Sequence, residues 1–198
     1  MRVAVLLDLL MATMDSVSTW SLAAGDRERG LAWRDAVTER MVAAGRYVPY
    51  DDLVVAAAAN LRLPEGAPNR LRVAWSEMRP WPDAAALRQL DVPFAFVTNC
   101  SRALAAEAVQ RSGLDPAFTL SAEESGWYKP RPEMYRLACT RMDASVGEVH
   151  FVAGAPYDAL GASAAGLRAT LVARRPPVGP LPPGIAVVSS LAEALSVG

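Results

Sequence analysis

Several residues of this chain could form a reactive carboxylate site. Asp8 ends the apolar run VAVLL, Lys129 lies in WYKPRPEMY, and Asp158 follows EVHFVAGA. Thr98 and Asn99 end a further run, VPFAFVTN. An ammonium group beside a carboxylate keeps that carboxylate ionised, and an ionised aspartate can act as a nucleophile or as a base. If the fold brings these side chains together, the chain has the groups needed for nucleophilic or acid–base catalysis.

The apolar runs themselves predict a parallel sheet. Short β-prone runs lie at residues 3–7, 92–99, 148–155, 168–173 and 185–190, and helical segments lie at 102–114, 131–142 and 158–167. Strands that alternate with helices indicate βαβ units and a doubly wound α/β fold. The carboxyl ends of parallel strands share one edge of the sheet, which is where ligands bind. The polar residues at the strand ends should therefore meet at that edge.

The first connection is too long for a single crossover helix. More than eighty residues separate Asp8 from Val92, whereas such loops usually take ~2–6 residues. Helical periodicity is visible at 31–45, 50–61 and 67–78. We therefore predict a helical subdomain at 15–89 over the edge of a core formed by 1–14 and 90–198. The proline-rich stretch RRPPVGPLPPG at 174–184 is predicted to be a surface loop.

The composition excludes several classes of function. The chain has 198 residues, of which 52% are hydrophobic and 21% charged, which is typical of a globular domain. Its net charge is -1, and it has neither a basic block nor a long apolar run, so nucleic acid and membrane are not expected partners. Cys100 and Cys139 fit no metal spacing and are predicted to be buried thiols of a cytoplasmic protein. The single histidine, His150, argues against histidine triads and histidine metal sites.

Each candidate residue also has an ordinary structural interpretation. Asp8 could cap a turn, and Thr98 or Asn99 could cap the helix predicted from residue 102. Lys129 taken alone would be a solvated surface charge, and Asp158 another helix cap. Their shared position along one edge of the sheet favours a common site over these separate roles.

The order and wording of these segments resemble the haloacid dehalogenase superfamily, in particular its type II L-2-haloacid dehalogenase branch. The resemblance covers nearly the whole chain and rests on WR at 33–34, GRYVPY at 45–50, FVTNCS at 96–101, YKPRPEMYRLA at 128–138 and YDALGASAAGLRATLV at 157–172. It implies a Rossmann-like three-layer α/β/α core with a small helical cap inserted after the first strand. Relatives of this branch are often dimers, so the apolar stretch 53–61 is either a homodimer interface or part of the cap core.

Leu10 argues against the phosphatases of this superfamily. Those enzymes carry a second aspartate two residues after the nucleophile, where this chain has Leu10, and further carboxylates that hold Mg²⁺. Asp158 stands here where phosphatases have an acidic pair, and a hard cation needs several oxygen ligands. The resemblance therefore implies an enzyme without metal or cofactor that acts on a small anionic or halogenated substrate.

The roles of the dehalogenase branch can be carried onto matching positions of this chain. Asp8 would attack the carbon that bears the halogen and form an ester, which water then cleaves. Lys129 would keep Asp8 ionised, and Arg34 would bind the departing halide. Asp158 would orient Lys129 and help to activate the water.

The remaining roles concern substrate binding. The Thr98 hydroxyl would bind the carboxylate of the substrate, and the Asn99 amide would help to hold the halide. Tyr135 would bond to the carboxylate network, while Tyr50 and Leu10 would line the apolar side of the pocket.

The chain departs from the branch in three places. Leu10-Met11-Ala12 stands where Tyr-Gly-Thr is typical, and Thr13 could replace that threonine only in a turn one residue longer. Ala153 and Ala155 stand where the branch has a serine and an asparagine. Each lost hydrogen-bond partner costs about 1–3 kcal/mol, so the ester would be hydrolysed slowly.

Three functions stay open at this point. The chain is a hydrolytic dehalogenase, or a related enzyme with an altered substrate or with non-hydrolytic chemistry such as intramolecular displacement, or a binding protein without catalysis. The retention of Asp8, Lys129 and Asp158 favours an enzyme, because a catalytically inactive site has no physical need for these charges.

Overall fold

The computed structural model describes residues 4–174 and 180–196 and contains one six-stranded parallel sheet. The strands are β1 (Ala4–Asp8), β2 (Phe94–Thr98), β3 (Thr119–Ser121), β4 (Val149–Ala153), β5 (Arg168–Val172) and β6 (Ala186–Val188). They lie in the order β3-β2-β1-β4-β5-β6. Residues 175–179 of the expected proline-rich loop, and 1–3 and 197–198 of the expected core, lie outside the described residues.

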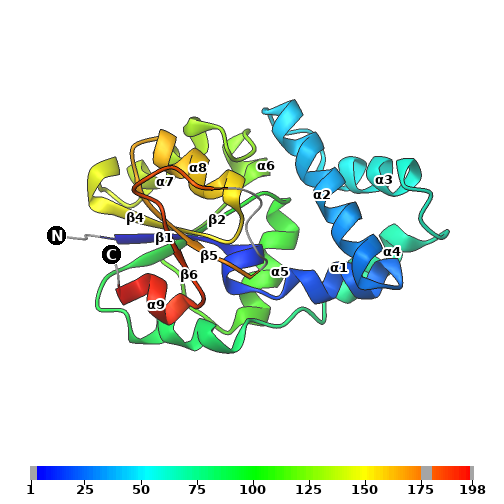
Figure 1. The fold of residues 1–198 in the computed structure, drawn as a ribbon, viewed down its shortest axis with the longest axis horizontal. Helices are drawn as coiled ribbons and strands as arrows, with labels where there is room; N and C mark the ends of the chain where they lie inside the picture. Colours follow the sequence, from blue (N-terminus) through cyan, green and yellow to red (C-terminus); the bar gives the residue numbers. More distant parts are fainter. Residues whose placement is uncertain (1–3, 175–179, 197–198) are drawn as a thin grey trace.

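Helices cover both faces of the sheet, and the predicted Rossmann-like α/β fold is confirmed. These helices are α5 (Arg102–Ser112), α6 (Ala122–Ser125), α7 (Pro132–Arg141), α8 (Pro156–Ala164) and α9 (Leu191–Ser196). Figure 1 shows α7 and α8 on one face and α9 on the other. Two 3-10 helices also belong to this part of the molecule. They are η2 (Pro82–Gln89) and η3 (Val146–Glu148), and η2 packs beside α9. We call the strands and these helices the sheet unit.

β1 lies inside the sheet, between β2 and β4. All of its residues are buried, because neighbouring strands flank it and helices cover both faces. This explains why its sequence is a continuous apolar run rather than an alternating one. Asp8 is the last residue of this strand, so the sheet itself carries the carboxylate to the middle of its edge.

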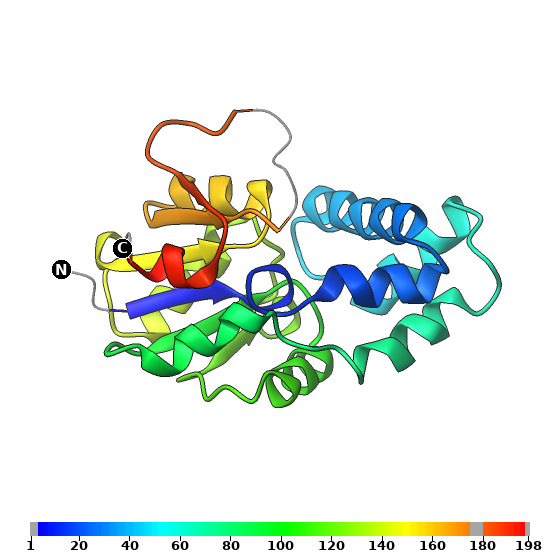
Figure 2. The same ribbon diagram turned by 60° about the horizontal axis from the view of Figure 1, so that its bottom comes forward.

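Four helices form a separate group between β1 and β2, which we call the helical unit. They are α1 (Ser16–Ala24), α2 (Arg27–Ala44), α3 (Tyr50–Asn60) and α4 (Ala67–Trp75). Figures 1 and 2 both show them side by side beyond the end of β1 at which Asp8 lies. Trp20 and Trp33 meet edge to face at 4.9 Å, and the Trp33 indole donates to the Val54 carbonyl at 2.9 Å. The helical unit therefore has a core of its own, while the expected boundaries at 15 and 89 stay a prediction.

The helical unit is joined to the sheet unit at two places. At the first, the two connecting segments pair with each other, since Asp15 N donates to Arg79 O at 2.8 Å and Trp81 N to Thr13 O at 2.9 Å. At the second, the linker after α2 pairs with the loop before Lys129. There Tyr47 N donates to Gly126 O at 2.9 Å, and Tyr128 N to Gly45 O at 2.8 Å. The two attachments fix the position of α2 over the edge of the sheet.

The apolar stretch 53–61 forms most of α3. Val54 and Ala57 are buried, whereas Val55 is exposed. The expected homodimer through this stretch stays a prediction. Within the described ranges, no helix is at once long and apolar enough to cross a bilayer.

Gly30 marks the closest approach of α1 and α2. A Cβ added there would lie 2.5 Å from the Ser21 Cα. We expect Gly30→Ala to push the two helices apart and to lower the free energy of unfolding by about 1–3 kcal/mol. Urea unfolding followed by circular dichroism measures this loss.

Gly147 provides the matched control, because an added Cβ meets nothing within 4 Å there. Gly147→Ala should change the free energy of unfolding by less than ~0.5 kcal/mol. Equal stability of the two variants would show that α1 and α2 do not pack as closely as described.

Candidate active site

Asp8 is held by the turn that follows it. Residues Leu9–Thr13 form a short π-helix, and the Asp8 Oδ2 accepts hydrogen bonds from Met11 N at 2.8 Å and Ala12 N at 3.2 Å. Asp8 therefore does cap a turn. Its other oxygen, Oδ1, points the opposite way and contacts Lys129. The Asp8 side chain stays 10% exposed, so a small molecule can reach it.

Lys129 is a fully buried cation between two carboxylates. Its Nζ donates to Asp8 Oδ1 at 2.9 Å, to Asp158 Oδ2 at 2.6 Å and to the Val97 carbonyl at 2.9 Å. These bonds use all three ammonium donors. Burial alone would lower the pKa of Lys129, but the charges of Asp158 and Asp8 outweigh it and raise that pKa. Lys129 is therefore a permanently charged group rather than a solvated surface lysine.

Asn99 fixes the backbone of Lys129. Its Oδ1 accepts from Lys129 N at 2.8 Å, and its Nδ2 donates to Lys129 O at 3.0 Å. Asn99 also lines the cavity above Asp8. Asn99 is expected to contact a halide, and its side-chain amide also has a structural role. It holds the backbone of Lys129 in place from the end of β2.

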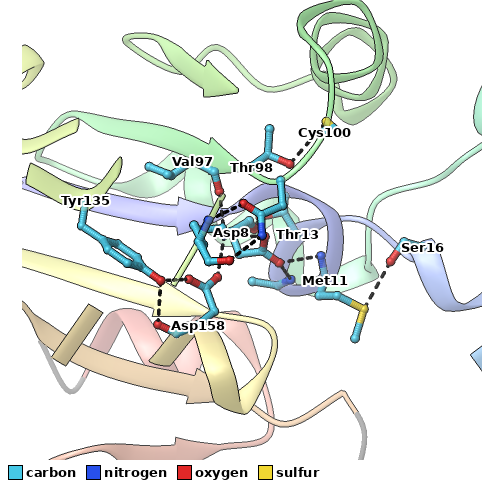
Figure 3. A network of polar contacts seen from close by, with 12 residues as sticks. Asp8, Met11, Thr13, Ser16, Val97, Thr98, Cys100, Tyr135 and Asp158 are labelled. Carbon is cyan, nitrogen blue, oxygen red and sulfur yellow. Dashed lines mark hydrogen bonds and ion pairs between the residues drawn. The ribbon is translucent and has the colours of Figure 1, made fainter. Parts of the chain in front are cut away.

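Asp158 and Tyr135 lie behind the lysine. Asp158 lies inside α8, whose N-cap is Ala155, so it is not a helix cap. The Tyr135 hydroxyl donates to Asp158 Oδ1 at 2.6 Å. Burial raises the pKa of Asp158 to about 6, against the opposing charge of Lys129, so Asp158 is ionised at neutral pH. Figure 3 shows these two residues on the side of Asp8 away from Met11 and Ser16.

The surroundings of Tyr135 and Asp158 bear on the roles expected for them. Tyr135 is fully buried, does not line the cavity, and makes the expected bond to the carboxylate network through Asp158. Asp158 is buried with both oxygens bonded, one to Lys129 and one to Tyr135. It orients Lys129, but it is not open to a water in the cavity.

Thr98 lies at the end of β2 and is fully buried. Its hydroxyl lies 3.6 Å from the Cys100 Sγ and is buried, and Figure 3 shows it directed toward that thiol. Of the pair Thr98 and Asn99, only Asn99 lines the cavity. The expected contact between the Thr98 hydroxyl and a substrate carboxylate stays a prediction. Neither residue caps α5, since Ser101 accepts from Leu104 N at 3.3 Å.

A cavity of about 30 Å³ lies over Asp8, between the sheet unit and the helical unit. Its walls are Asp8, Leu10, Met11, Asn99 and Tyr157 from the sheet unit and the turn after β1, and Ser16, Trp20, Arg34, Val37, Thr38, Met41 and Tyr50 from the helical unit. The expected residues Arg34, Tyr50 and Leu10 are thus all brought to the carboxylate. The volume is enough for one or two water-sized groups, so the site admits only a small reacting centre.

Arg34 is the cation of the helical unit at this cavity. Its side chain is 12% exposed, and its Nη1 lies 3.4 Å from the Asp35 Oδ1. Residues 34, 37, 38 and 41 line the cavity from one face of α2, as the helical repeat requires. Arg34 thus adds a positive charge on the side of the cavity opposite the Asp8 carboxylate, next to its partner Asp35.

Sequence reasoning missed several residues of the cavity wall. Tyr157 lies next to Asp158, and burial raises the pKa of its hydroxyl to about 12, so it is neutral. Thr38 and Met41 lie one and two turns after Arg34. The helical repeat counted from Arg34 within the predicted helix 31–45 was the signal that could have found them.

The residues that depart from the dehalogenase branch lie in the turn after β1 and in the loop after β4. The Thr13 hydroxyl donates to the Asp8 carbonyl at 3.2 Å and is fully buried, so it does not replace a threonine at the carboxylate. Ala153 is fully buried, and Ala155 is nearly so. Gly154 packs under the turn, since an added Cβ would lie 2.3 Å from Ala12 N. The loop after β4 therefore supports Asp8 sterically but offers it no side-chain hydrogen bond.

Comparison with known proteins identifies the family. A family model described as haloacid dehalogenase-like hydrolase matches residues 14–166, which is most of the chain. The chain belongs to the haloacid dehalogenase-like hydrolases. The family resemblance stated from the sequence is thereby confirmed.

Similar proteins of this family carry dehalogenase names. The chain is 32% identical to (S)-2-haloacid dehalogenase 1 of Pseudomonas sp. (strain CBS-3) over 112 residues, covering 54% of this chain and 49% of that protein. It is 31% identical to (S)-2-haloacid dehalogenase 4A of Burkholderia cepacia over 137 residues, covering 65% and 59%. The chain thus spans about half to three fifths of the length of these curated relatives. A solved dehalogenase structure is 25% identical with a TM-score of 0.84, covering 99% of this chain and 96% of that one.

The buried charges make Lys129 a sensitive position. Lys129→Met would leave Asp8 and Asp158 facing each other without the ammonium between them. Breaking a buried pair in this way costs about 3–5 kcal/mol, and we expect that loss in the free energy of unfolding at pH 7. Urea denaturation of the wild type and the variant measures it.

A surface ion pair of similar length is the control. Arg141 and Glu124 are 2.7 Å apart, with side chains 35% and 23% exposed. Arg141→Met should cost only about 0–1 kcal/mol, because solvent screens exposed pairs. A loss for Lys129→Met no larger than this would mean that the buried lysine does not hold the two carboxylates together.

Proposed function

We propose that this protein hydrolyses the carbon–halogen bond of small 2-haloacids, without a metal, through an ester on Asp8. The observation that carries the proposal is the arrangement of the Asp8 carboxylate at the small cavity. Lys129 and two backbone amides orient the carboxylate, and Arg34 lines the same cavity. The dehalogenase names of the curated relatives, and their (S)-2-haloacid substrates, support the same reaction class.

The first step is a displacement at carbon. Oδ1 of Asp8 accepts one hydrogen bond, whereas Oδ2 accepts two, so Oδ1 keeps the more available lone pair. Oδ1 attacks the carbon that bears the halogen, the carbon–halogen bond breaks, and the electron pair leaves with the halide. Arg34 lies in the same cavity, and its guanidinium stabilises the departing anion.

The second step is cleavage of the ester by water. Attack on Cγ of Asp8 places negative charge on Oδ2, which already faces Met11 N and Ala12 N. These backbone donors form a preorganised oxyanion site. The bond from Cγ to Oδ1 then breaks, and the 2-hydroxy acid leaves with that oxygen and one proton of the water, while the other proton passes to solvent and restores the Asp8 carboxylate. Lys129 bonds to Oδ1 and stabilises the charge that develops there.

Activation of the water is the weak part of this site. Asp158 is buried with both oxygens engaged, and Ala153 and Ala155 present no polar side chain. The hydroxyl-bearing neighbours in the wall include Tyr157, whose pKa of about 12 makes it a poor base at neutral pH. The ester should therefore form faster than it breaks down.

The slow second step predicts an ester that accumulates. After mixing with 2-chloropropanoate, intact-protein mass spectrometry should show an adduct on Asp8, with a burst of about one halide per enzyme. We expect cleavage of the ester to be at least roughly tenfold slower than its formation, a barrier difference of ~1.4 kcal/mol or more.

Two controls accompany this measurement. Asp8→Asn should give neither adduct nor burst. In ¹⁸O water, the first turnover should release an unlabelled 2-hydroxy acid, because its new oxygen comes from Asp8. Labelled product in the first turnover would overturn the ester mechanism.

We also propose that the reaction needs no metal ion. The Lys129 ammonium lies 2.9 Å from Asp8 and 2.6 Å from Asp158, and it supplies the positive charge that a cation would bring. Leu10 lines the cavity as an apolar residue. Lys129 and Tyr135 already engage the oxygens of Asp158, so few oxygen ligands are left for a hard divalent ion.

Chelation tests this proposal. Halide release should be unchanged after dialysis against EDTA and should not rise when Mg²⁺ is added. A phosphatase activity that requires Mg²⁺, lost on chelation, would contradict the proposed chemistry.

The helical unit completes the proposal as a cap. Helices α1, α2 and α3 supply most of the cavity wall opposite Asp8 and keep bulk water away, which strengthens the charge interactions inside. We further propose a cytoplasmic location, supported by Cys100 and Cys139, which are buried free thiols.

A further inference from the structure

A second and much larger cavity adjoins the one at Asp8. It has a volume of about 310 Å³, is partly open to solvent, and is lined by Met11, Arg34, Asp35, Thr38, Glu39, Gly154, Ala155, Pro156, Tyr157 and Leu171. Four of these residues, Met11, Arg34, Thr38 and Tyr157, also line the small cavity. The two cavities are therefore neighbours, separated by these four side chains. A molecule bound at Asp8 can extend between them into the larger cavity.

The larger cavity has an apolar floor and an acidic rim. Gly154, Ala155, Pro156 and Leu171 offer no charged or hydrogen-bonding side chain. Asp35 and Glu39 lie on the side formed by α2. An apolar cavity of about 150 Å³ is already enough to bind benzene. This space is therefore suited to an uncharged apolar group.

Ala155 is one of the alanines that depart from the dehalogenase branch. It is 8% exposed and belongs to the wall of the larger cavity. A larger polar side chain at this position would occupy part of the space and would bring donors and acceptors that an apolar ligand cannot satisfy. The alanine thus removes hydrogen bonding and adds apolar volume at the same place.

Met11 forms the movable part of the shared wall. Its backbone is fixed, since its N donates to Asp8 and its O accepts from the Trp81 indole at 3.1 Å. Its side chain is held by one polar contact, from the Ser16 hydroxyl to the Sδ at 3.2 Å. A methionine side chain is unbranched and changes rotamer readily. It can turn aside without disturbing the carboxylate.

We propose that the larger cavity binds the carbon chain of the substrate, so that this enzyme prefers 2-haloacids with a long unbranched or aromatic substituent. The α-carbon reacts at Asp8, while the substituent passes Met11 and lies against Ala155 and Leu171. This inference rests on the proposed function, of which it specifies the substrate class. Dicarboxylic 2-haloacids are poor substrates, because the apolar floor leaves a second carboxylate without hydrogen-bond partners.

A chain-length series tests the preference in the unmodified protein. Bromide release is measured under single-turnover conditions for bromoacetate, 2-bromobutanoate, 2-bromohexanoate and 2-bromooctanoate. Each buried methylene should raise kcat/KM roughly threefold, as expected for transfer of that group from water. Values that stay level or fall from bromoacetate to 2-bromooctanoate would overturn the inference.

A matched pair of variants locates the effect. Ala155→Leu fills the larger cavity and should lower the ratio of kcat/KM for 2-bromooctanoate to that for bromoacetate by about tenfold or more. Ala164→Leu places the same side chain on the exposed end of α8 and should keep the wild-type ratio. If both variants keep that ratio, the chain does not lie against Ala155.

Binding of halogen-free acids separates this inference from the proposed function. Calorimetry with acetate, hexanoate and octanoate needs no chemistry, and octanoate should bind to the wild type at least tenfold more tightly than acetate. If no haloacid reacts while octanoate binds tightly and Ala155→Leu abolishes that binding, the proposed reaction fails and the chain-binding site stands. If bromoacetate reacts but octanoate binds no better than acetate, the reaction stands and the chain-binding site fails.

Discussion

The buried ammonium of Lys129 holds the site together. It joins β1, β2 and α8 by bonding at once to Asp8, to the Val97 carbonyl and to Asp158. Two carboxylates this close could not both stay ionised in a dry interior without it. The sequence separation of these residues is large, so the charge balance forms only when the sheet is complete. The chemistry of the site and the integrity of the fold thus depend on the same three charges.

Around this charge cluster the chain uses backbone groups where side chains are absent. The π-helical turn after β1 aims two amides at the Asp8 Oδ2, and Gly154 allows that turn to pack against the loop after β4. Backbone donors do not depend on the identity of Leu10, Met11 or Ala12. This explains how the chain can differ from the dehalogenase branch in these positions and still orient its carboxylate.

The sheet was largely predictable from the sequence, and the reasons are physical. Buried parallel strands are apolar throughout, so β1, β2 and β4 stand out as continuous runs. β3 has three residues, Thr119–Ser121, which is too short to leave a pattern. α1 was missed because its sequence SVSTWSLAA mixes small polar and apolar residues without a clear helical repeat.

The site was predictable in part. Parallel topology brings Asp8, Asn99 and Asp158 to one edge, and this followed from their places after the strands. Which face Thr98 takes did not follow, because alternation along a strand fixes relative but not absolute direction. The burial of Lys129 depends on contacts with β1, β2 and α8, which are distant in sequence, so no local pattern encodes it.

The two attachments of the helical unit differ in how much movement of the helices they allow. Pairing of the segments around Asp15 and Arg79 would survive a swing of the helices, whereas the bonds that Tyr47 and Tyr128 make would have to break. Since Tyr128 directly precedes Lys129, such a swing would pull on the residue that balances the charges. Side-chain rotation at Met11 disturbs neither attachment and displaces far fewer atoms than the microsecond-to-millisecond motion of a whole domain. Exchange of small molecules with the interior can therefore proceed with the helices in place, so that solvent viscosity, which slows large-scale motion, should have little influence on turnover.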